Sequence, residues 1–138
     1  MNTAEPTTGL QVLLVEDEEA NRALVRAVLA RSGEPRIRDL DLLEAGSLRA
    51  ARALLAEHAI DIVLLDVRLP DGNGLELAAE LMARGEGERP KVIVMSASVL
   101  PAEQAAAITA GCDAFLAKPF RRAQLTEALA SLAERETA

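Results

Sequence analysis

Acidic, hydroxyl and amine side chains stand at the ends of four short apolar segments of this chain. The segments, each with the polar residues that follow it, are Val12–Val15 with Glu16 and Asp17, Ile62–Leu65 with Asp66, Val92–Met95 with Ser96, and Ala114–Ala117 with Lys118. One polar residue after an apolar segment is weak evidence for a site. Four such endings carry more weight if the fold brings them to one place.

Asp66 is the most informative of these residues. It ends an apolar segment and is followed at once by a turn rich in Pro and Gly, Val67–Gly74. A buried strand that breaks into such a turn places its last residue at the rim of a sheet. A carboxylate at that rim can reach solvent, a metal ion or a substrate.

The residue types together indicate phosphoryl chemistry. Glu16, Asp17 and Asp66 would bring like charges close together, which raises at least one pKa and favours a divalent cation. Carboxylate and backbone oxygens suit Mg²⁺ better than Zn²⁺. Lys118 and Ser96 could then bind phosphate oxygens, and Asp66 could attack phosphorus in line to form an acyl phosphate.

Ten elements are needed to position these side chains. The apolar segments predict five strands, at Val12–Val15, Leu40–Ala45, Asp61–Asp66, Val92–Met95 and Ala114–Ala117. The helical patterns and their caps predict five helices, at Glu19–Arg31, from a Ser47 cap to about His58, at Gly74–Ala83, at Pro101–Ala110 and from Arg121 to about Glu134.

Strands that alternate with helices predict an α/β fold. Because the central apolar segments are continuous rather than alternating, the sheet should be parallel and covered by helices on both faces. Right-handed crossovers then give a flavodoxin-like, doubly wound sheet of five strands in the order 2-1-3-4-5. In such a fold the ligand crevice lies at the carboxyl ends of the strands, where the polar residues stand.

Length and composition fit one domain in a reducing compartment. The chain has 138 residues, half of them apolar, and we expect a tail at 1–10, a domain at 11–135 and a short tail at 136–138. A net charge of −7 argues against nucleic acid or an anionic membrane as partner. A single cysteine, no apolar segment of membrane-spanning length and no secretory signal together predict a cytoplasmic protein.

Four ordered motifs resemble the response regulator receiver domains of two-component signalling. They are Leu13–Asp17, Leu64–Gly74, Val94–Ala97 and Gly111–Phe120. The resemblance extends from Val12 to about Ala133, and it implies an Mg²⁺-dependent phosphoacceptor rather than a true enzyme.

The resemblance also implies a role for each residue. Asp66 would accept the phosphoryl group, and Lys118 and Ser96 would bind it. Asp17, Glu16, Asp66 and the backbone carbonyl of Arg68 would hold the metal ion. Ser96 and Phe115 would act as switch residues, and Lys118-Pro119 would be a cis peptide bond.

Three features depart from the usual family pattern. Glu16 stands where Asp is commonest, Phe115 replaces the commoner Tyr, and the link Gly33–Ala45 into the second strand is longer than usual. We also hypothesise that Arg68 and Ser98 tune dephosphorylation.

The resemblance implies protein partners. A histidine kinase or a histidine phosphotransfer protein would donate the phosphoryl group, docking on Ala20, Ala23, Leu24 and the Pro119-Phe120 loop. The face made by the fourth helix, fifth strand and fifth helix would change shape to signal to a downstream protein. The chain is expected to be a stand-alone regulator or a receiver of a hybrid kinase or phosphorelay, monomeric or dimerising on phosphorylation.

Other function classes stay open from sequence alone. An Mg²⁺-dependent phosphatase with an Asp nucleophile is the main alternative, although no second acid stands two residues after Asp66. A flavin-binding protein would need a phosphate-binding loop after the first strand, where Glu16–Glu19 would repel phosphate. A receiver that is never phosphorylated is the third alternative.

Overall fold

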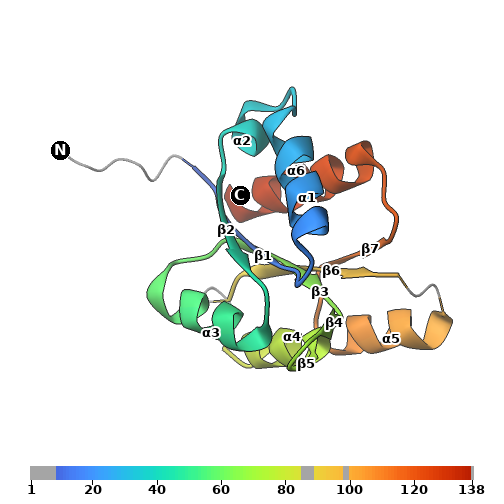
Figure 1. Cartoon of the computed structure of the whole chain (residues 1–138). Coiled ribbons are helices and arrows are strands. Elements are labelled where there is room, and N and C mark those ends of the chain that lie inside the picture. The colour runs from blue at the N-terminus through green and yellow to red at the C-terminus, as the bar shows by residue number, and fades with distance from the viewer. Residues whose placement is uncertain (1–8, 85–88, 98–99, 138) are drawn as a thin grey trace.

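Five short apolar segments pair in parallel to form the central sheet of the computed structural model, which describes residues 9–84, 89–97 and 100–137. The strands are β1 (Gln11–Val15), β2 (Asp41–Ala45), β3 (Ile62–Asp66), β6 (Lys91–Ser96) and β7 (Ala114–Ala117). Their order is β2-β1-β3-β6-β7 (Figure 1), which confirms the predicted 2-1-3-4-5 topology. The central strand β3 is buried along its whole length, as a parallel strand covered on both faces must be.

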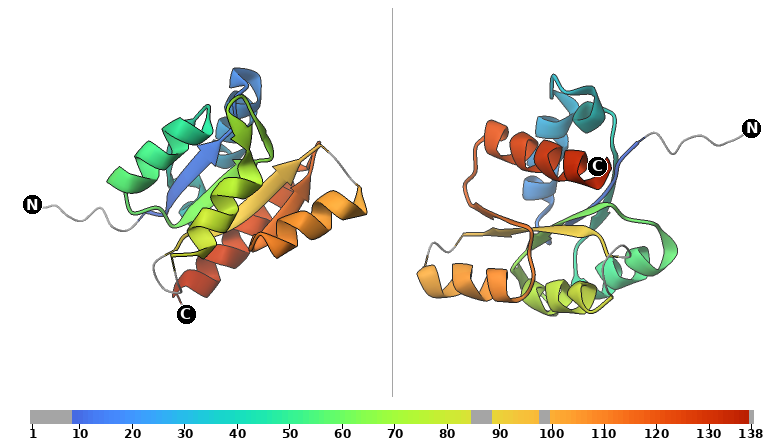
Figure 2. Two further views of the ribbon diagram at one scale, coloured as in Figure 1. Left: turned by 90° about the horizontal axis from the view of Figure 1, so that it is seen from below. Right: turned by 180° about the vertical axis from the view of Figure 1, so that it is seen from behind.

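Helices cover both faces of the sheet (Figures 1 and 2). One face carries α1 (Glu19–Ala30), α2 (Pro35–Arg38) and α6 (Arg122–Thr137), and the other carries α3 (Leu48–Glu57), α4 (Gly74–Met82) and α5 (Pro101–Thr109). Successive strand residues point to opposite faces, so Leu64 joins the core beneath α1 and α6 while Leu65 joins the core beneath α3 and α4. The fold is therefore the doubly wound α/β architecture predicted from the sequence.

The structure adds one short helix to the predicted elements. In the long link before β2, Pro35 occupies the first turn of α2, and Ile37 is fully buried in the core beneath α1 and α6. A four-residue helix is too short to give a periodic sequence signal, which is why this segment was predicted only as a link. The strand that follows begins at Asp41 rather than Leu40, and α6 ends at Thr137 rather than near Glu134.

The turn after Asp66 is a small antiparallel hairpin. Its strands are β4 (Arg68–Leu69) and β5 (Gly72–Asn73), joined by Pro70 and Asp71. The Asn73 side chain caps α4 by accepting a hydrogen bond of 2.8 Å from the Leu75 N–H. The hairpin thus leads from the Asp66 carboxylate directly into a capped helix.

The tip of this hairpin is bound to the start of α3. The two carboxylate oxygens of Asp71 accept hydrogen bonds from the backbone N–H groups of Leu48 and Arg49, at 2.8 and 3.0 Å. Ser47 caps the same helix through the Ala50 N–H at 3.1 Å, as predicted. Three of the helix's free N–H groups are satisfied in this way.

Gly74 lies against the backbone of Asp66. A β-carbon at Gly74 would collide with the Asp66 carbonyl oxygen and would crowd the side chain of Leu65. The Gly74 N–H also donates a hydrogen bond of 2.7 Å to the Val67 carbonyl, which closes the base of the hairpin. Only glycine permits this close approach.

Among the described residues, no helix combines the length and apolar character needed to cross a bilayer.

We expect Gly74→Ala to destabilise the protein, because the new methyl group must displace the backbone that carries Asp66. The expected loss in free energy of unfolding is about 1–3 kcal/mol, typical of overpacking. Gly33→Ala is the matched control, since a β-carbon there meets nothing within 4 Å, and it should stay within about 0.5 kcal/mol of wild type. Urea unfolding followed by circular dichroism measures both, and equal losses would contradict the assigned contact.

The hydrogen bond donors around Asp71 also predict a pH dependence. The Leu48 and Arg49 N–H groups hold the pKa of Asp71 below its usual range. A lowered folded-state pKa contributes stability above the unfolded-state pKa, near 4, and that contribution is lost as the pH falls through the folded value. Between about pH 4 and pH 2, the wild type should therefore lose stability more steeply than Asp71→Asn.

Ser47→Ala is the control for this pH dependence, because it removes a cap from the same helix without removing a titrating group. Its stability should run parallel to that of the wild type over the same pH range. If Asp71→Asn also ran parallel to the wild type, the Asp71 contact would contribute nothing to acid sensitivity.

Candidate functional site

The carboxyl ends of the strands bring the predicted charged residues together. Glu16 and Asp17 follow β1, Asp66 ends β3, and Lys118 follows β7. One carboxylate oxygen from each of Glu16, Asp17 and Asp66 lies within 4.8 Å of the other two. Asp66 is 8% exposed, so its carboxylate sits at the rim of the sheet with a narrow opening to solvent.

Lys118 links two of these three carboxylates. Its Nζ lies 2.8 Å from Glu16 Oε1 and 3.3 Å from Asp66 Oδ2. The backbone N–H of Lys118 donates a 2.7 Å hydrogen bond to the Ser96 carbonyl, and the Lys118-Pro119 bond is cis, as predicted. Lys118 is therefore a specific partner of the cluster rather than a solvated surface lysine.

Burial and charge shift the pKa values of these groups in different directions. Burial raises the pKa of Asp66 above its usual range; the Lys118 charge opposes this rise and the Glu16 charge adds to it. For Glu16, burial alone would raise the pKa, but hydrogen bonds from Lys118 and the Glu18 N–H outweigh it and lower the pKa. A further positive charge beside Asp66 would therefore favour its charged form.

The environment of Lys118 favours its charged form. Burial alone would lower the pKa of Lys118, but the hydrogen bond to Glu16 and the charge of Asp66 outweigh it and raise the pKa. An ammonium group thus stands beside the Asp66 carboxylate at neutral pH.

Glu16 is buried, at 2% exposure. Besides Lys118, it accepts hydrogen bonds from the Glu18 N–H at 3.1 Å and the Asn21 side chain at 3.3 Å. Arg22 donates a 2.6 Å hydrogen bond to the Glu16 backbone carbonyl. These donors hold the Glu16 side chain inside the site.

Asp17 and Arg68 complete the rim of the site. Asp17 is exposed, so its carboxylate can exchange ligands with solvent. The backbone N–H of Arg68, the first residue of the hairpin, acts on the Asp66 carboxylate and opposes the rise in its pKa. The Arg68 side chain is exposed.

Ser96 and Phe115 lie on neighbouring strands: Ser96 ends β6, and Phe115 is the second residue of β7. Ser96 is 4% exposed and follows Met95, the register partner of Asp66. Both Ser96 and the half-buried Phe115 line a cavity of about 310 Å³ next to α5. Ser98, the other residue suggested to tune dephosphorylation, lies outside the described residues.

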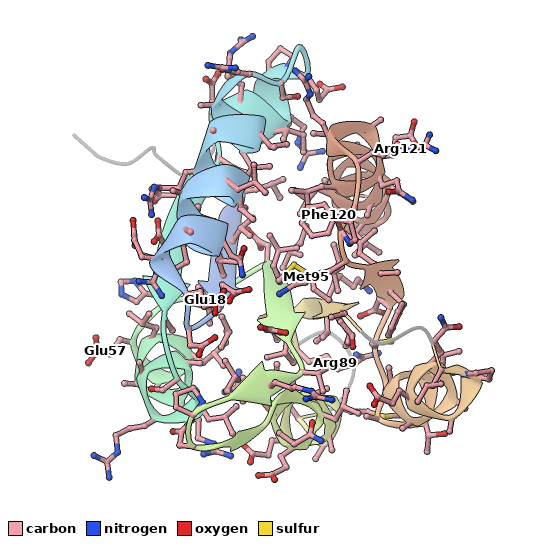
Figure 3. All side chains as sticks on the ribbon, turned by 45° about the vertical axis from the view of Figure 1, so that its right-hand side comes forward. Glu18, Glu57, Arg89, Met95, Phe120 and Arg121 are labelled. Atoms are coloured by element: carbon pink, nitrogen blue, oxygen red, sulfur yellow. The ribbon has the colours of Figure 1, made fainter. Side chains whose placement is uncertain are left out.

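An apolar groove opens between α1 and α6 next to the cluster. One cavity of about 250 Å³ is lined by Glu16, Lys118, Leu24 and Phe120 among others. A second cavity, of about 280 Å³, shares Leu24 and Phe120 and continues to Arg31 and Arg122. Figure 3 shows Phe120 in the gap between these two helices, with Met95 below it.

Sequence reasoning missed four residues that organise the site. They are Asn21, Arg22, Asp71 and Gly74. All four act through backbone groups or neighbouring side chains, so residue type alone gave no signal for Asn21 or Arg22. The Pro/Gly-rich turn did indicate a special backbone at Asp71 and Gly74, but not which contacts require it.

The residues present fit a hard divalent cation. Three carboxylates converge, and Lys118 pairs with only two of them. Oxygen ligands with excess negative charge are the set that Mg²⁺ prefers. Such an ion would stabilise the charged form of Asp66, whose pKa burial raises.

Comparisons with known proteins agree on the family. The model of the response regulator receiver domain matches residues 12–130. The two-component response regulator ORR41 of Oryza sativa subsp. japonica is 37% identical over 121 residues, which cover 88% of this chain and 92% of that protein. The aerobic respiration control sensor protein ArcB of Escherichia coli is also 37% identical over 122 residues, covering 88% of this chain but only 15% of ArcB.

Solved structures give the same fold. A receiver domain protein from Methanospirillum hungatei JF-1 superposes with a TM-score of 0.79 at 22% identity, covering 94% of this chain and 98% of that one. In several of the relatives the chain corresponds to one part of a longer protein, such as about half of the regulatory protein KdpE of Escherichia coli. The chain belongs to the response regulator receiver domain family, and it is a receiver domain of two-component signalling.

Proposed function

We propose that this receiver accepts a phosphoryl group on Asp66 from a phosphohistidine of a partner protein, in an Mg²⁺-dependent reaction. The observation that carries the proposal is the arrangement of Asp66, with Lys118 Nζ at 3.3 Å and with carboxylate oxygens of Glu16 and Asp17 within 4.8 Å. This geometry supports a nucleophile beside a fixed cation and a metal-ligand set.

In the proposed step an Asp66 carboxylate oxygen attacks phosphorus. A new P–O bond forms and the P–N bond to the donor imidazole breaks, with its electron pair returning to the imidazole nitrogen. Lys118 turns from Glu16 toward the phosphoryl oxygens and neutralises part of their charge. Mg²⁺, when held by Glu16, Asp17, Asp66 and the Arg68 carbonyl, supplies the remaining positive charge.

The acyl phosphate would act as a switch through Ser96 and Phe115. Both residues line the same 310 Å³ cavity beside α5, which gives the phosphorylated form room to rearrange. Ser96 would move toward the phosphoryl group and Phe115 would follow, changing the face formed by α5, β7 and α6. A downstream protein would read this change in a two-state element.

The partner that donates the phosphoryl group is proposed to dock on α1 and the loop after Lys118. Leu24 is 57% exposed on α1, unusual for a leucine, and it lines the groove together with Phe120. A helix of a histidine kinase or phosphotransfer protein could bury these side chains and bring its phosphohistidine to Asp66. The groove's position directly beside Lys118 supports this choice.

The family assignment favours this function over the phosphatase alternative. Hydrolysis would be limited to slow self-catalysed loss of the acyl phosphate, so the chain would act as a signalling phosphoacceptor. The cytoplasmic location, the domain limits at 11 and 135, and the oligomeric state, a monomer or a dimer formed on phosphorylation, stay predictions.

Asp66→Asn should abolish phosphorylation, because an amide has no nucleophilic carboxylate oxygen. Wild-type protein incubated with acetyl phosphate and Mg²⁺ should gain one phosphoryl group by intact-mass spectrometry, and EDTA should prevent it. Asp41→Asn is the control, since the Asp41 carboxylate is exposed at the start of β2 and accepts a hydrogen bond of 2.9 Å from the Gln11 side chain. Unmodified wild type, or a modified Asp66→Asn, would refute the proposal.

Leu24→Glu should slow phosphotransfer from a protein donor while leaving the site chemistry intact. Placing a charge in the buried centre of an interface should cost at least about tenfold in transfer rate. The measurement is the rate of transfer from a phosphorylated histidine phosphotransfer domain that reacts with the wild type. Ile108→Glu is the control, because Ile108 is 68% exposed on α5, across the sheet from α1.

Acetyl phosphate should phosphorylate Leu24→Glu and Ile108→Glu at the rate at which it phosphorylates the wild type. If Leu24→Glu transferred as fast as Ile108→Glu from the protein donor, the donor would not dock on α1.

A further inference from the structure

Asp71 joins the loop that follows Asp66 to a helix from another part of the chain. Its two carboxylate oxygens bond the N–H groups of Leu48 and Arg49, which lie 23 and 22 residues away in sequence. Ser47 caps the same helix from within, through the Ala50 N–H. Both side chains satisfy N–H groups at one helix end, but the Asp71 hydrogen bonds also tie that end to the loop after Asp66.

The base of the hairpin is fixed separately. The Val67 N–H donates to the Met95 carbonyl at 3.2 Å, and the Gly74 N–H donates to the Val67 carbonyl at 2.7 Å. Arg68 lies between this base and the tip at Asp71, two residues after Asp66, and its N–H opposes the rise in the Asp66 pKa. The placement of Arg68 thus depends on both ends of the hairpin.

The helix α3, whose first N–H groups bond Asp71, is itself fixed to the rest of the domain. Leu48 is buried in the core, and it stands so close to Gly72 that a β-carbon there would lie 2.9 Å from its side chain. Arg52 on α3 pairs with Glu80 on α4 through two hydrogen bonds, at 3.0 and 2.6 Å. A contact with α3 therefore fixes the hairpin tip against the body of the domain.

We propose that Asp71 is a positioning residue of the phosphoryl site: by holding the hairpin on α3, it keeps the Arg68 backbone in place against Asp66. Its part in metal binding, through the Arg68 carbonyl, rests on the proposed function. The hairpin is short, with two residues in each strand, so its own ladder cannot fix the tip. Without Asp71, the hairpin tip loses both of its hydrogen bonds to α3 and keeps the packing of Leu48 against Gly72.

A simple capping role would give a different result from a positioning role. If Asp71 only stabilised α3, its removal would resemble the removal of Ser47, with lost stability and an unchanged site. A positioning role instead predicts that removing the Asp71 side chain changes the placement of the Arg68 backbone, whereas removing the Ser47 side chain leaves it unchanged.

The first test compares metal-free Asp71→Ala with Ser47→Ala by amide hydrogen exchange under conditions where both are folded. We expect the Arg68 N–H to lose its protection in Asp71→Ala and to keep it in Ser47→Ala. Asp71→Asn, which retains one acceptor oxygen, should lie between Asp71→Ala and the wild type. It replaces Asp71→Ala in the comparison if the alanine variant does not fold.

The second test measures the Mg²⁺ dissociation constant of the same variants by isothermal titration calorimetry. Loss of a residue that supports a metal ligand typically weakens affinity at least tenfold, so Asp71→Ala should bind Mg²⁺ about tenfold more weakly. Ser47→Ala should bind Mg²⁺ as the wild type does.

Equal protection of Arg68 in the two variants, or equal Mg²⁺ affinity, would overturn the proposal. A wild type that binds no Mg²⁺ would refute the proposed function instead. The metal-free exchange comparison would then still decide whether Asp71 holds the hairpin.

Discussion

Three carboxylates forced together by parallel strands are the constraint on which the rest of the site depends. The strand order places the ends of β1 and β3 side by side, so Glu16, Asp17 and Asp66 cannot avoid one another. Lys118, delivered by β7, compensates two of these charges. Burial still raises the pKa of Asp66 despite Lys118, so a metal ion beside this carboxylate would stabilise its charged form.

The surrounding structure keeps this unfavourable charge arrangement rigid. Donors from Asn21 and the Glu18 backbone hold Glu16, while the Arg68 backbone holds Asp66. Gly74 permits the chain to turn directly beneath Asp66, and Asp71 fastens the turn to α3. The residues that bear charge are thus few, but many backbone contacts determine where the charges lie.

The strand order and the main site residues could be predicted because each has a strong local signal. Continuous apolar segments identified the strands, and the polar residues that end them identified Asp66, Glu16, Asp17 and Lys118. The helix α2 was missed because four residues show no periodicity, although Ile37 anchors it in the core. The contact between Asp71 and α3 was missed because it joins residues 23 apart in sequence. A local sequence pattern does not show which helix a turn contacts in the folded chain.

The most direct measurement is the crystal structure of the chain with Mg²⁺ and beryllofluoride, a stable mimic of the acyl phosphate. Our account predicts beryllium bonded to an Asp66 carboxylate oxygen, the metal ion between Asp66, Glu16 and Asp17, and Lys118 turned from Glu16 to a fluoride. Beryllofluoride bound elsewhere, or Lys118 still paired with Glu16 beside an unmodified Asp66, would contradict it.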